Sequence, residues 1–495
     1  MRAKINKHIL FIVFSMFYLT FSLFTYKDYG ITSDEQVNYR AGGVYVNYLF
    51  LGPGRRQEIE QKASPKDDPQ KYPAFRLYPG LVSIINLLSC YESAHLINLL
   101  FGYFGFLIIY LLVFDITHSR FSILAPLLLF LNPHYFGHIP ANPKDIPFST
   151  LYLFCVYLLI KLRTDKVTNF VVLGIFLGLL TATRFVGGVL FLFLILKVLF
   201  GLNNHGKMDK RILYLIITVS VSFILLYAIW PYLWHNPISK LLMLARNADE
   251  FSFWDRKILF EGILITKTER PWYYLFTYIF YKTPLLILVG LLGSLFGKYH
   301  KTIFITSIAL FNLLLYLLFQ PVIYNEMRHF LYLIPVFTVL SSILFIDLLT
   351  NETALIYKTV FIVIVLGLLK MSYDFVLLHP YQYVYFNEFA GKMVDITKKY
   401  EVDYWSASYK ESSEYLRNLS LKSPTPIKVY PCNLDFGVDY YSHKDFVVVN
   451  KPEEADYVIC DNLNALKKDL DLENKIIFRV VRKGATLSYV AKTIK

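Results

Sequence analysis

The sequence predicts a polytopic α-helical membrane protein with about eleven transmembrane helices and a small α/β domain at its C-terminus. Of the 495 residues, 55% are hydrophobic and 17% are aromatic, whereas a soluble globular chain has about 45–50% apolar residues. The hydrophobic residues fall in blocks of roughly 18–22, the length of a helix that crosses a bilayer. After residue 379 these blocks end, and the sequence alternates as in an α/β domain.

Eleven apolar blocks are long enough to be read as membrane helices. They cover residues 8–26, 95–114, 121–137, 146–163, 167–183, 185–202, 211–230, 274–297, 302–320, 329–348 and 356–378. The apolar stretch 75–90 is shorter, which favours an interfacial or re-entrant helix. No small-residue cleavage site follows the first block, so we expect an uncleaved first helix.

Short basic loops set the expected orientation. Lys and Arg gather at the N-terminus, around residue 120, and in the segments 161–166, 207–211, 298–301 and 358. Cytoplasmic loops are enriched in these residues. The N-terminus is therefore expected in the cytoplasm of a cell with an inner (plasma) membrane. The loops 27–94 and 231–273 and the extracytoplasmic domain 380–495 then lie on the outer side of the transmembrane domain 1–379.

The net charge of +13 belongs almost entirely to the membrane part. The tail from 380 to 495 has 17 Lys and Arg against 16 Asp and Glu, which leaves 33 against 21 for the first 379 residues. The basic cytoplasmic loops explain most of this excess, and an anionic, phosphate-bearing substrate is the second interpretation. Because no basic domain stands clear of the membrane, no nucleic acid is expected as a partner.

The tail has the pattern of a small α/β domain. A helix is expected at 408–420, strands at 427–431, 445–449 and 457–460, and a final hairpin of 476–482 and 486–491 that turns at Lys483-Gly484. Cys432 and Cys460 lie at the ends of two predicted strands, so we expect them to form a disulfide in an oxidising compartment. Cys90 and Cys155 are expected to be packing residues, and the segment 52–73 is a candidate mobile loop.

Two segments on the outer side carry candidate acids. Asp34 and Glu35 follow the first span in the segment 32–35, where they form either a reactive pair or a solvated helix N-cap. The segment 138–147 holds Lys144 and Asp145 among three prolines at the membrane edge. Ionisable groups at that depth are costly and tend to be functional, although Lys144 reaching to headgroups beside a capping Asp145 is the alternative.

Two further segments carry candidate cations. Arg184 stands alone where two apolar runs meet, and it either marks a turn or holds a phosphate, because a guanidinium matches phosphate oxygens bidentately. Arg328 and His329 lie in the segment 324–329 before the tenth span, as interfacial anchors or as phosphate or sugar contacts.

This set of residues favours one class of reaction. A polyprenyl-phosphate-linked sugar presents its phosphate at the membrane surface, and sugar transfer requires an acid residue as base and cations for the departing phosphate. No Walker A motif, dinucleotide fingerprint or serine-hydrolase elbow is present, so a soluble nucleotide donor has no site. No cofactor or metal is expected, although paired carboxylates leave a divalent ion open.

Several stretches resemble those of the C-class membrane glycosyltransferases. The chain is similar over about 8–348 to the dolichyl-phosphate-mannose protein mannosyltransferases and bacterial aminoarabinose transferases of glycosyltransferase family 39. It resembles most an uncharacterised bacterial branch, in FGHIPANPKDIPF (136–148), RPWYYLF (270–276), YNEMRHFLYLIP (324–335), HPYQYVYFNEFAG (379–391) and YEVDYWSASYKES (400–412). The protein mannosyltransferases have a domain inserted in a central loop that this chain lacks, so the acceptor stays open among lipid, glycan and protein.

The resemblance implies a transfer of a monosaccharide from a polyprenyl-phosphate donor on the extracytoplasmic side. The family's acid in the first outer loop matches Asp34, and its second acid matches Asp145. The expected site residues are Asp34, Glu35 and Asp145 for catalysis, Lys144, Arg184 and Arg328 for the donor phosphate, and His138, Asn142 and His329 for substrate contacts. The alternatives are a transporter or flippase of a lipid-linked sugar, which places ionisable groups near the bilayer centre, and a non-catalytic envelope scaffold.

Overall fold

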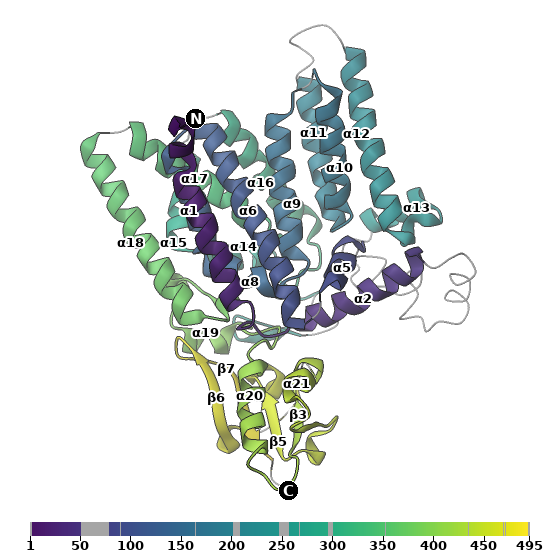
Figure 1. The fold of residues 1–495 in the computed structure, drawn as a ribbon, viewed down its shortest axis with the longest axis vertical. Helices are drawn as coiled ribbons and strands as arrows, with labels where there is room; N and C mark the ends of the chain where they lie inside the picture. The colour runs from purple at the N-terminus through teal and green to yellow at the C-terminus, as the bar shows by residue number, and fades with distance from the viewer. Residues whose placement is uncertain are drawn as a thin grey trace.

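The computed structural model describes most of the chain, and its fold is shown in Figure 1. The described residues are 2–50, 79–89, 91–163, 165–200, 208–246, 257–266, 268–295, 300–351, 353–433, 435–468, 470 and 472–493. The expected mobile loop 52–73 and Cys90 lie outside these ranges.

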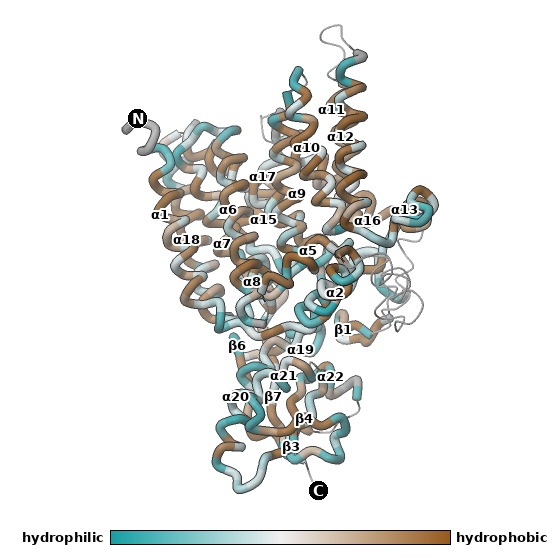
Figure 2. Tube along the Cα trace, turned by 45° about the vertical axis from the view of Figure 1, so that its right-hand side comes forward, coloured by the Kyte–Doolittle hydropathy of each residue, from teal (hydrophilic) through white to brown (hydrophobic). Residues whose placement is uncertain are grey.

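Within the described residues, six helices are long and apolar enough to cross a membrane, or up to eight spans if two bent helix pairs each count as one. The six are α1 (Arg2–Thr25), α6 (Ala94–Thr117), α12 (Met208–Ile229), α16 (His300–Phe319), α17 (Leu333–Asn351) and α18 (Ala354–Leu378). The tube in Figure 2 is brown along these helices, as apolar spans require. The chain is therefore a multi-pass α-helical protein, and the number of eleven spans remains a prediction.

The other expected spans are bent or short. The bent pairs are α8 (Pro133–Ala141) with α9 (Asp145–Lys161), at 114°, and α14 (Tyr274–Lys282) with α15 (Leu285–Ser294), at 113°. Three apolar helical segments have 10–17 residues: Arg120–Phe130, Val167–Thr181 and Phe185–Phe200. They contain η4 (Arg120–Ile123), α7 (Leu124–Phe130), α10 (Val167–Thr181), η5 (Phe185–Gly188) and α11 (Val189–Phe200).

The segment expected as a loop at 138–147 is largely helical. A separate helix, α8, starts at Pro133 because proline suits the first position of a helix and Asn132 accepts a hydrogen bond from the Tyr135 N–H at 3.2 Å. Only residues Asn142–Lys144 are not helical between the end of α8 and the start of α9 at Asp145. The expected span 121–137 therefore ends near Phe130, and α8 runs at an angle to it.

Amphipathic and short elements lie across one end of the helix bundle. Helix α2 (Ser33–Phe50) crosses that end beside α5 (Leu81–Ile85), as Figures 1 and 2 both show. The short helix α5 and η2 (Asn86–Leu88) occupy the apolar stretch that is too short for a span. The remaining elements before the tail are η3 (Tyr91–Ser93), η7 (Pro231–Trp234), α13 (Pro237–Arg246), β1 (Ile258–Phe260), β2 (Ile263–Ile265), η8 (Arg328–Phe330), η9 (Gln382–Val384), η10 (Glu388–Ala390) and α19 (Met393–Lys399).

The tail contains a five-stranded sheet in the order β4-β3-β5-β7-β6. Strand β3 runs parallel to β4 and β5, whereas β7 is antiparallel to β5 and β6. The expected strands and helix are confirmed, with β4 shorter than predicted. The elements are α20 (Tyr409–Ser420), β3 (Lys428–Pro431), α21 (Asp435–Ser442), β4 (Val447–Val448), η11 (Pro452–Glu454), β5 (Tyr457–Cys460), α22 (Asn462–Lys467), η12 (Glu473–Lys475), β6 (Ile476–Arg482) and β7 (Ala485–Lys492).

The hairpin between β6 and β7 turns where the sequence predicts. Lys483 and Gly484 have φ angles of 47° and 81°, the left-handed values of a tight two-residue hairpin turn. Glycine adopts such angles without steric cost. This turn brings Lys483 to the membrane part, where its amine lies 2.6 Å from the buried carboxylate of Asp374 on α18.

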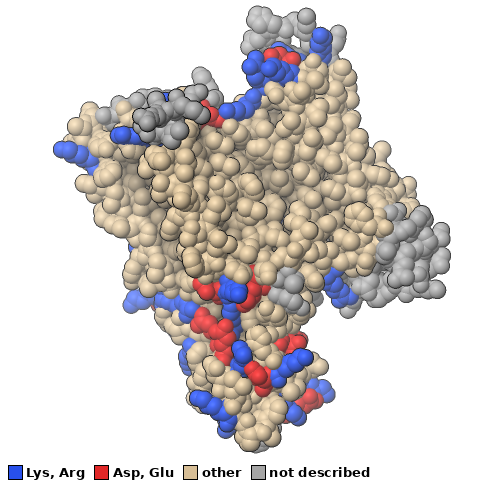
Figure 3. Space-filling view, viewed as in Figure 1, with Lys and Arg blue, Asp and Glu red and all other residues tan. Residues whose placement is uncertain are grey.

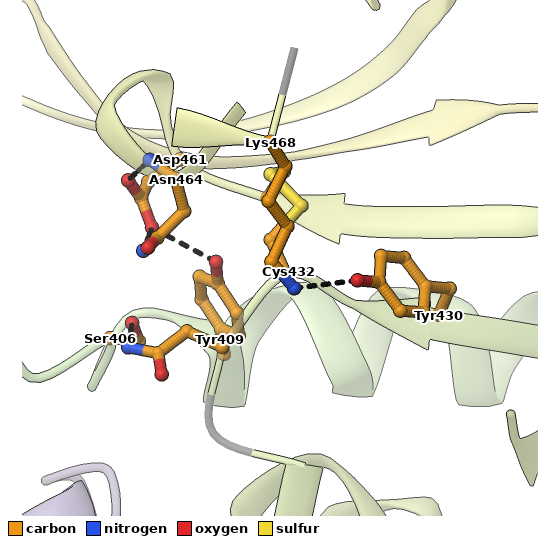
Figure 4. Close-up of a disulfide and its surroundings, with 9 residues drawn as sticks. Ser406, Tyr409, Tyr430, Cys432, Asp461, Asn464 and Lys468 are labelled. Carbon is orange, nitrogen blue, oxygen red and sulfur yellow. Dashed lines mark hydrogen bonds between the residues drawn. A yellow bond between two sulfur atoms is a disulfide. The ribbon is translucent and has the colours of Figure 1, made fainter. Parts of the chain in front are cut away.

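The predicted disulfide between Cys432 and Cys460 is confirmed. Their Cα atoms are 5.0 Å apart, at the ends of the parallel neighbours β3 and β5, which is within the roughly 7 Å that a disulfide can bridge. Figure 4 shows it beside a hydrogen bond from Lys468 to the Tyr430 hydroxyl, of 2.5 Å. The bridge joins β3 and β5 at their carboxyl ends, next to the loop that contacts the helix bundle.

The tail is joined to the helix bundle by ion pairs, and Figure 3 shows red and blue atoms gathered at this junction. Lys410 of α20 lies 2.8 Å from Glu92, and Lys370 of α18 pairs with Glu388 of η10. Arg482 of β6 pairs with Glu411 within the tail and donates to the backbone carbonyl of His379 at 2.8 Å. These partly screened pairs fix the orientation of the tail more than they add stability.

A tight loop, Asp403–Ser408, lies between the tail and the bundle. The carboxylate of Asp403 accepts hydrogen bonds from the N–H groups of Ala407 and Ser408, both at 3.1 Å, and from the Tyr383 hydroxyl. Ser406 has a φ of 55° and accepts a bond from Asn433 at 2.9 Å. Asp403 therefore fixes the loop at both of its ends.

The buried carboxyl of Asp403 makes the stability of this loop depend on pH. Burial raises the pKa of Asp403 to about 6, against the lowering effect of the bonds from Ser408 and Tyr383. A raised folded-state pKa adds stability that is present below about pH 4, the unfolded value, and is lost as the pH rises through 6. We expect the melting temperature of the wild type, relative to Asp403→Asn, to fall between pH 4 and pH 7. An unchanged difference between the two proteins would contradict this assignment.

Candidate active site

Four charged side chains from separate parts of the chain meet at the end of the bundle that faces the tail. Arg328 of η8 places its Nη2 atom 2.7 Å from Asp34 Oδ2 and its Nε atom 3.5 Å from Asp145 Oδ2. Arg184, between α10 and η5, pairs with the second carboxylate oxygen of Asp145. The guanidinium of Arg328 thus bridges Asp34 and Asp145, and the carboxylate of Asp145 contacts both Arg184 and Arg328.

The break between α8 and α9 positions Asp145. The Asn142 side-chain oxygen accepts the N–H of Asp145 at 2.8 Å, and its amide nitrogen donates to Asp145 Oδ2 at 2.8 Å. That nitrogen also donates to His138 Nδ1 at 3.0 Å, which leaves the His138 Nε2–H to donate to the Tyr404 hydroxyl at 3.1 Å. His138 and Asn142, expected as substrate contacts, have these polar groups engaged in orienting Asp145.

The adjacent acids Asp34 and Glu35 have different surroundings. Glu35 accepts the N–H of Thr32 at 2.7 Å, which is the reciprocal bond of a capping box at the start of α2. Its other oxygen lies 2.9 Å from His95 Nε2. Asp34 instead faces Arg328, and its side chain keeps 26% of its surface exposed. The N-cap interpretation therefore describes Glu35, whereas Asp34 is the acid that a ligand can reach.

Arg328 is buried but remains charged. Its side chain is 5% exposed, and the guanidinium carbon lies 5.3 Å from the centre of the Tyr324 ring and 5.5 Å from that of Trp405. Burial lowers the pKa of Arg328, but the carboxylates of Asp34 and Asp145 outweigh that effect and raise it. The two aromatic faces and two carboxylates hold the cation in one place.

Lys144 and His329 complete the set of predicted residues. Lys144 precedes α9, is half-buried, and interacts electrostatically with Arg184, Asp34, Asp145 and Arg328. The His329 ring packs edge-on against Tyr324, with ring centres 4.6 Å apart. Burial and the nearby arginines lower the pKa of His329 well below its usual value, so its imidazole is neutral.

A second buried ion pair lies next to this cluster and was not among the predicted site residues. Lys282 of α14 and Glu326 are both fully buried, with 2.5 Å between Nζ and Oε1. His134 of α8 lies 3.9 Å from the other oxygen of Glu326. Burial raises the pKa of Glu326 to about 8. The sequence feature that could have revealed this pair is Lys282, a lysine inside the apolar block 274–297. An ionisable group in such a block is costly and tends to be functional.

The arrangement combines an accessible carboxylate with several cations. Asp34 can accept a proton, and Arg328, Arg184 and Lys144 can hold an anion beside it, in a site largely removed from water. Charges act more strongly in such surroundings than in bulk water. The chemistry that these residues support is the removal of a proton next to an anionic leaving group.

The comparisons with known proteins place part of the chain in a family context. Residues 83–230 match the model of the dolichyl-phosphate-mannose-protein mannosyltransferase family. None of the curated proteins matches this sequence.

Two solved structures of ArnT from Cupriavidus metallidurans, in the apo state and bound to undecaprenyl phosphate, are 12% and 11% identical with TM-scores of 0.49. Each alignment covers 99% of this chain and 98% of that chain. The archaeal oligosaccharyltransferase AglB from Archaeoglobus fulgidus, in complex with an inhibitory peptide and a dolichol-phosphate, is 12% identical with a TM-score of 0.40, over 86% of this chain and 61% of that one. These TM-scores lie below 0.5, so it is the family match over residues 83–230 that relates this chain to known proteins.

The matched region contains Lys144, Asp145 and Arg184, together with α8 and the break that positions them. The resemblance to the dolichyl-phosphate-mannose protein mannosyltransferases is thus confirmed for residues 83–230.

Proposed function

We propose that this protein is a membrane glycosyltransferase that moves a monosaccharide from a polyprenyl-phosphate donor to an acceptor hydroxyl. One observation carries the proposal: Arg328 bridges Asp34 and Asp145, while Arg184 pairs with Asp145. Two guanidinium groups and an accessible acid are thereby held together where the helix bundle meets the tail. The family match over 83–230 supports the same class of reaction.

In the proposed reaction Asp34 accepts the proton of the acceptor hydroxyl. The acceptor oxygen then bonds to the anomeric carbon of the sugar, and the bond from that carbon to the phosphate oxygen breaks. The electron pair leaves with the polyprenyl phosphate. Arg328, Arg184 and Lys144 stabilise the negative charge that develops there.

Binding of the donor also provides a way to free the base. In the structure Arg328 Nη2 lies 2.7 Å from Asp34 Oδ2, so this carboxylate is engaged by the guanidinium. A donor phosphate competes for the same guanidinium, and Asp145 keeps Arg184 and Arg328 in place while it does so. The proposed site has three cations of its own, so the reaction as proposed needs no metal ion.

We further propose that the site lies on the extracytoplasmic side of the inner membrane. The exposed basic residues Lys161, which ends α9, and Arg163, which follows it, lie at the end remote from the tail, and Figure 3 shows blue atoms at that end. The positive-inside rule assigns such an end to the cytoplasm. A lipid, a glycan and a protein all remain candidate acceptors.

Replacement of Asp34 tests the base directly. Asp34→Asn is expected to lower kcat by roughly 10²–10⁴, the usual contribution of a general base. The neighbouring Glu35→Gln is the matched control, because glutamine keeps an oxygen for the Thr32 N–H. It should retain activity within about tenfold, since one capping interaction contributes about 1 kcal/mol. Transfer would be measured with purified protein at saturating donor, and near-normal turnover by Asp34→Asn rules out the assignment.

Replacement of the arginines tests the phosphate contacts. Arg184→Ala and Arg328→Ala are each expected to weaken use of the donor by about 1–3 kcal/mol, the scale of a lost charge-assisted contact. The KM for the acceptor should stay nearly unchanged. Arg163→Ala, at the exposed remote end, serves as the control. Equal losses for donor and acceptor would show that the arginines act on folding and not on the phosphate.

Reporter fusions test the orientation. Alkaline phosphatase fused after Lys495 should be active, and green fluorescent protein at the same position should be dark, because the tail is expected outside the cytoplasm. Fusions that end at Lys166, in a basic loop, should give the opposite pair of signals. A fluorescent fusion without phosphatase activity after Lys495 would reverse the proposed topology.

A further inference from the structure

The buried nitrogen donors at the Asp34 cluster that lack a hydrogen-bond partner within the described residues include Trp405 Nε1 and Arg328 Nη1. Trp405 is fully buried, Arg328 is 5% exposed, and the guanidinium carbon lies 5.5 Å from the centre of the Trp405 ring. Most buried donors in folded proteins are paired, and an unpaired one costs about 1–3 kcal/mol. Two such donors this close together indicate that a ligand supplies the acceptor.

The charges around Trp405 and Arg328 favour an anionic ligand. Arg184, Arg328 and Lys144 provide three positive charges against the two carboxylates of Asp34 and Asp145, so the cluster has a formal excess of one positive charge. An N–H of arginine and an N–H of indole both require an acceptor and neither can serve as one. An oxygen of a phosphate group satisfies both donors and the excess charge.

Trp405 lies beside Arg328 because the loop Asp403–Ser408 packs against the helix bundle. Its ring centre lies 5.0 Å from that of His138, 4.9 Å from that of Tyr404 and 5.2 Å from that of Tyr383. The indole is therefore fixed on several sides by other rings. A donor fixed in this way needs little further ordering when a ligand binds.

The same loop touches the segment that leads to Asp34. A Cβ atom on Gly30 would come within 2.1 Å of the Ala407 carbonyl oxygen, so only glycine permits this approach. The next residue, Ile31, donates its N–H to the Tyr441 hydroxyl of α21 at 2.9 Å. The tail thus contacts the segment that leads to Asp34 through the backbone, and it contacts Arg328 through the ring of Trp405.

From these contacts we infer that the tail supplies part of the donor site, with the indole N–H of Trp405 binding an oxygen of the donor phosphate beside Arg328. The inference rests on the proposed glycosyltransferase function and adds a binding residue from outside the membrane domain. Trp405 is a phosphate ligand in this assignment, and it also positions Arg328 through its ring.

The test uses full-length protein in lipid nanodiscs and two probes, undecaprenyl phosphate and undecaprenol, which share the chain and differ in the phosphate. Trp405→Phe removes the N–H and keeps an aromatic ring. Replacement of Trp405 by β-(3-benzothienyl)alanine keeps the full two-ring shape and exchanges the N–H for sulfur. Trp272→Phe, at a position with 59% exposure, is the matched control, and thermal unfolding of each variant checks the fold.

Both Trp405 variants should bind undecaprenyl phosphate about tenfold more weakly, as expected for one hydrogen bond to a charged group, with undecaprenol binding unchanged. Trp272→Phe should bind both probes like the wild type. Wild-type affinity of the benzothienyl variant for undecaprenyl phosphate overturns the inference, even if Trp405→Phe does not fold. If Arg328→Ala weakens phosphate binding in that case, the proposed function survives. If the wild type binds both probes equally, the donor assignment and this inference fail together.

Discussion

The site depends on a single guanidinium that is shared between two acids. Arg328 contacts Asp34 and Asp145, which come from different helices and are separated by more than a hundred residues of sequence. Removal of one partner of a buried pair leaves an uncompensated charge, which typically costs 3–5 kcal/mol. The start of α2, the break before α9 and the start of η8 are therefore tied to each other through one side chain. An anion that competes for this side chain acts on all three segments at once.

The tail and the helix bundle behave as parts of one site. The loop Asp403–Ser408 carries Trp405 into the bundle, and Tyr404 completes the hydrogen-bond path through His138 and Asn142 to Asp145. Ion pairs across the junction hold the rest of the tail against the bundle. A tail attached to the membrane part without a role in the site would need neither the packing of Trp405 among the rings of His138, Tyr383 and Tyr404 nor the close backbone approach at Gly30.

The sequence was most informative where local chemistry dictates structure. Lys483-Gly484 requires a left-handed turn, and alternating residues on either side of it predict the hairpin. Asp145 and Arg184 stood out because ionisable groups beside apolar runs are costly, and the structure pairs them. The cysteine pair followed from strand ends that parallel pairing brings together.

The rest depends on contacts between distant segments, which a pattern within one segment does not encode. Trp405 lies in the quoted stretch 400–412, but nothing within that stretch gives it a role, and only its packing against His138 and Arg328 reveals one. The Lys282–Glu326 pair joins two segments whose partners are not evident from either alone. Residues 138–141 were expected outside the helices because the segment 138–147 has three prolines, yet Pro140 lies inside α8 and only Asn142–Lys144 separates α8 from α9. The same holds for the short and bent helices, which are stabilised by their neighbours and not by their own length.

The contact between Gly30 and Ala407 also sets an order for biosynthesis. The ribosome makes the segment before Asp34 first, but the loop that packs against it follows some 370 residues later. At roughly 5–20 residues per second, synthesis of the intervening chain takes on the order of 20–75 s. During that time the nascent protein has its early helices but not the Asp403–Ser408 loop, so the charged cluster is incomplete. A loop that is made late in synthesis thus completes the site, and translation products that end before it have only an unfinished version of the site.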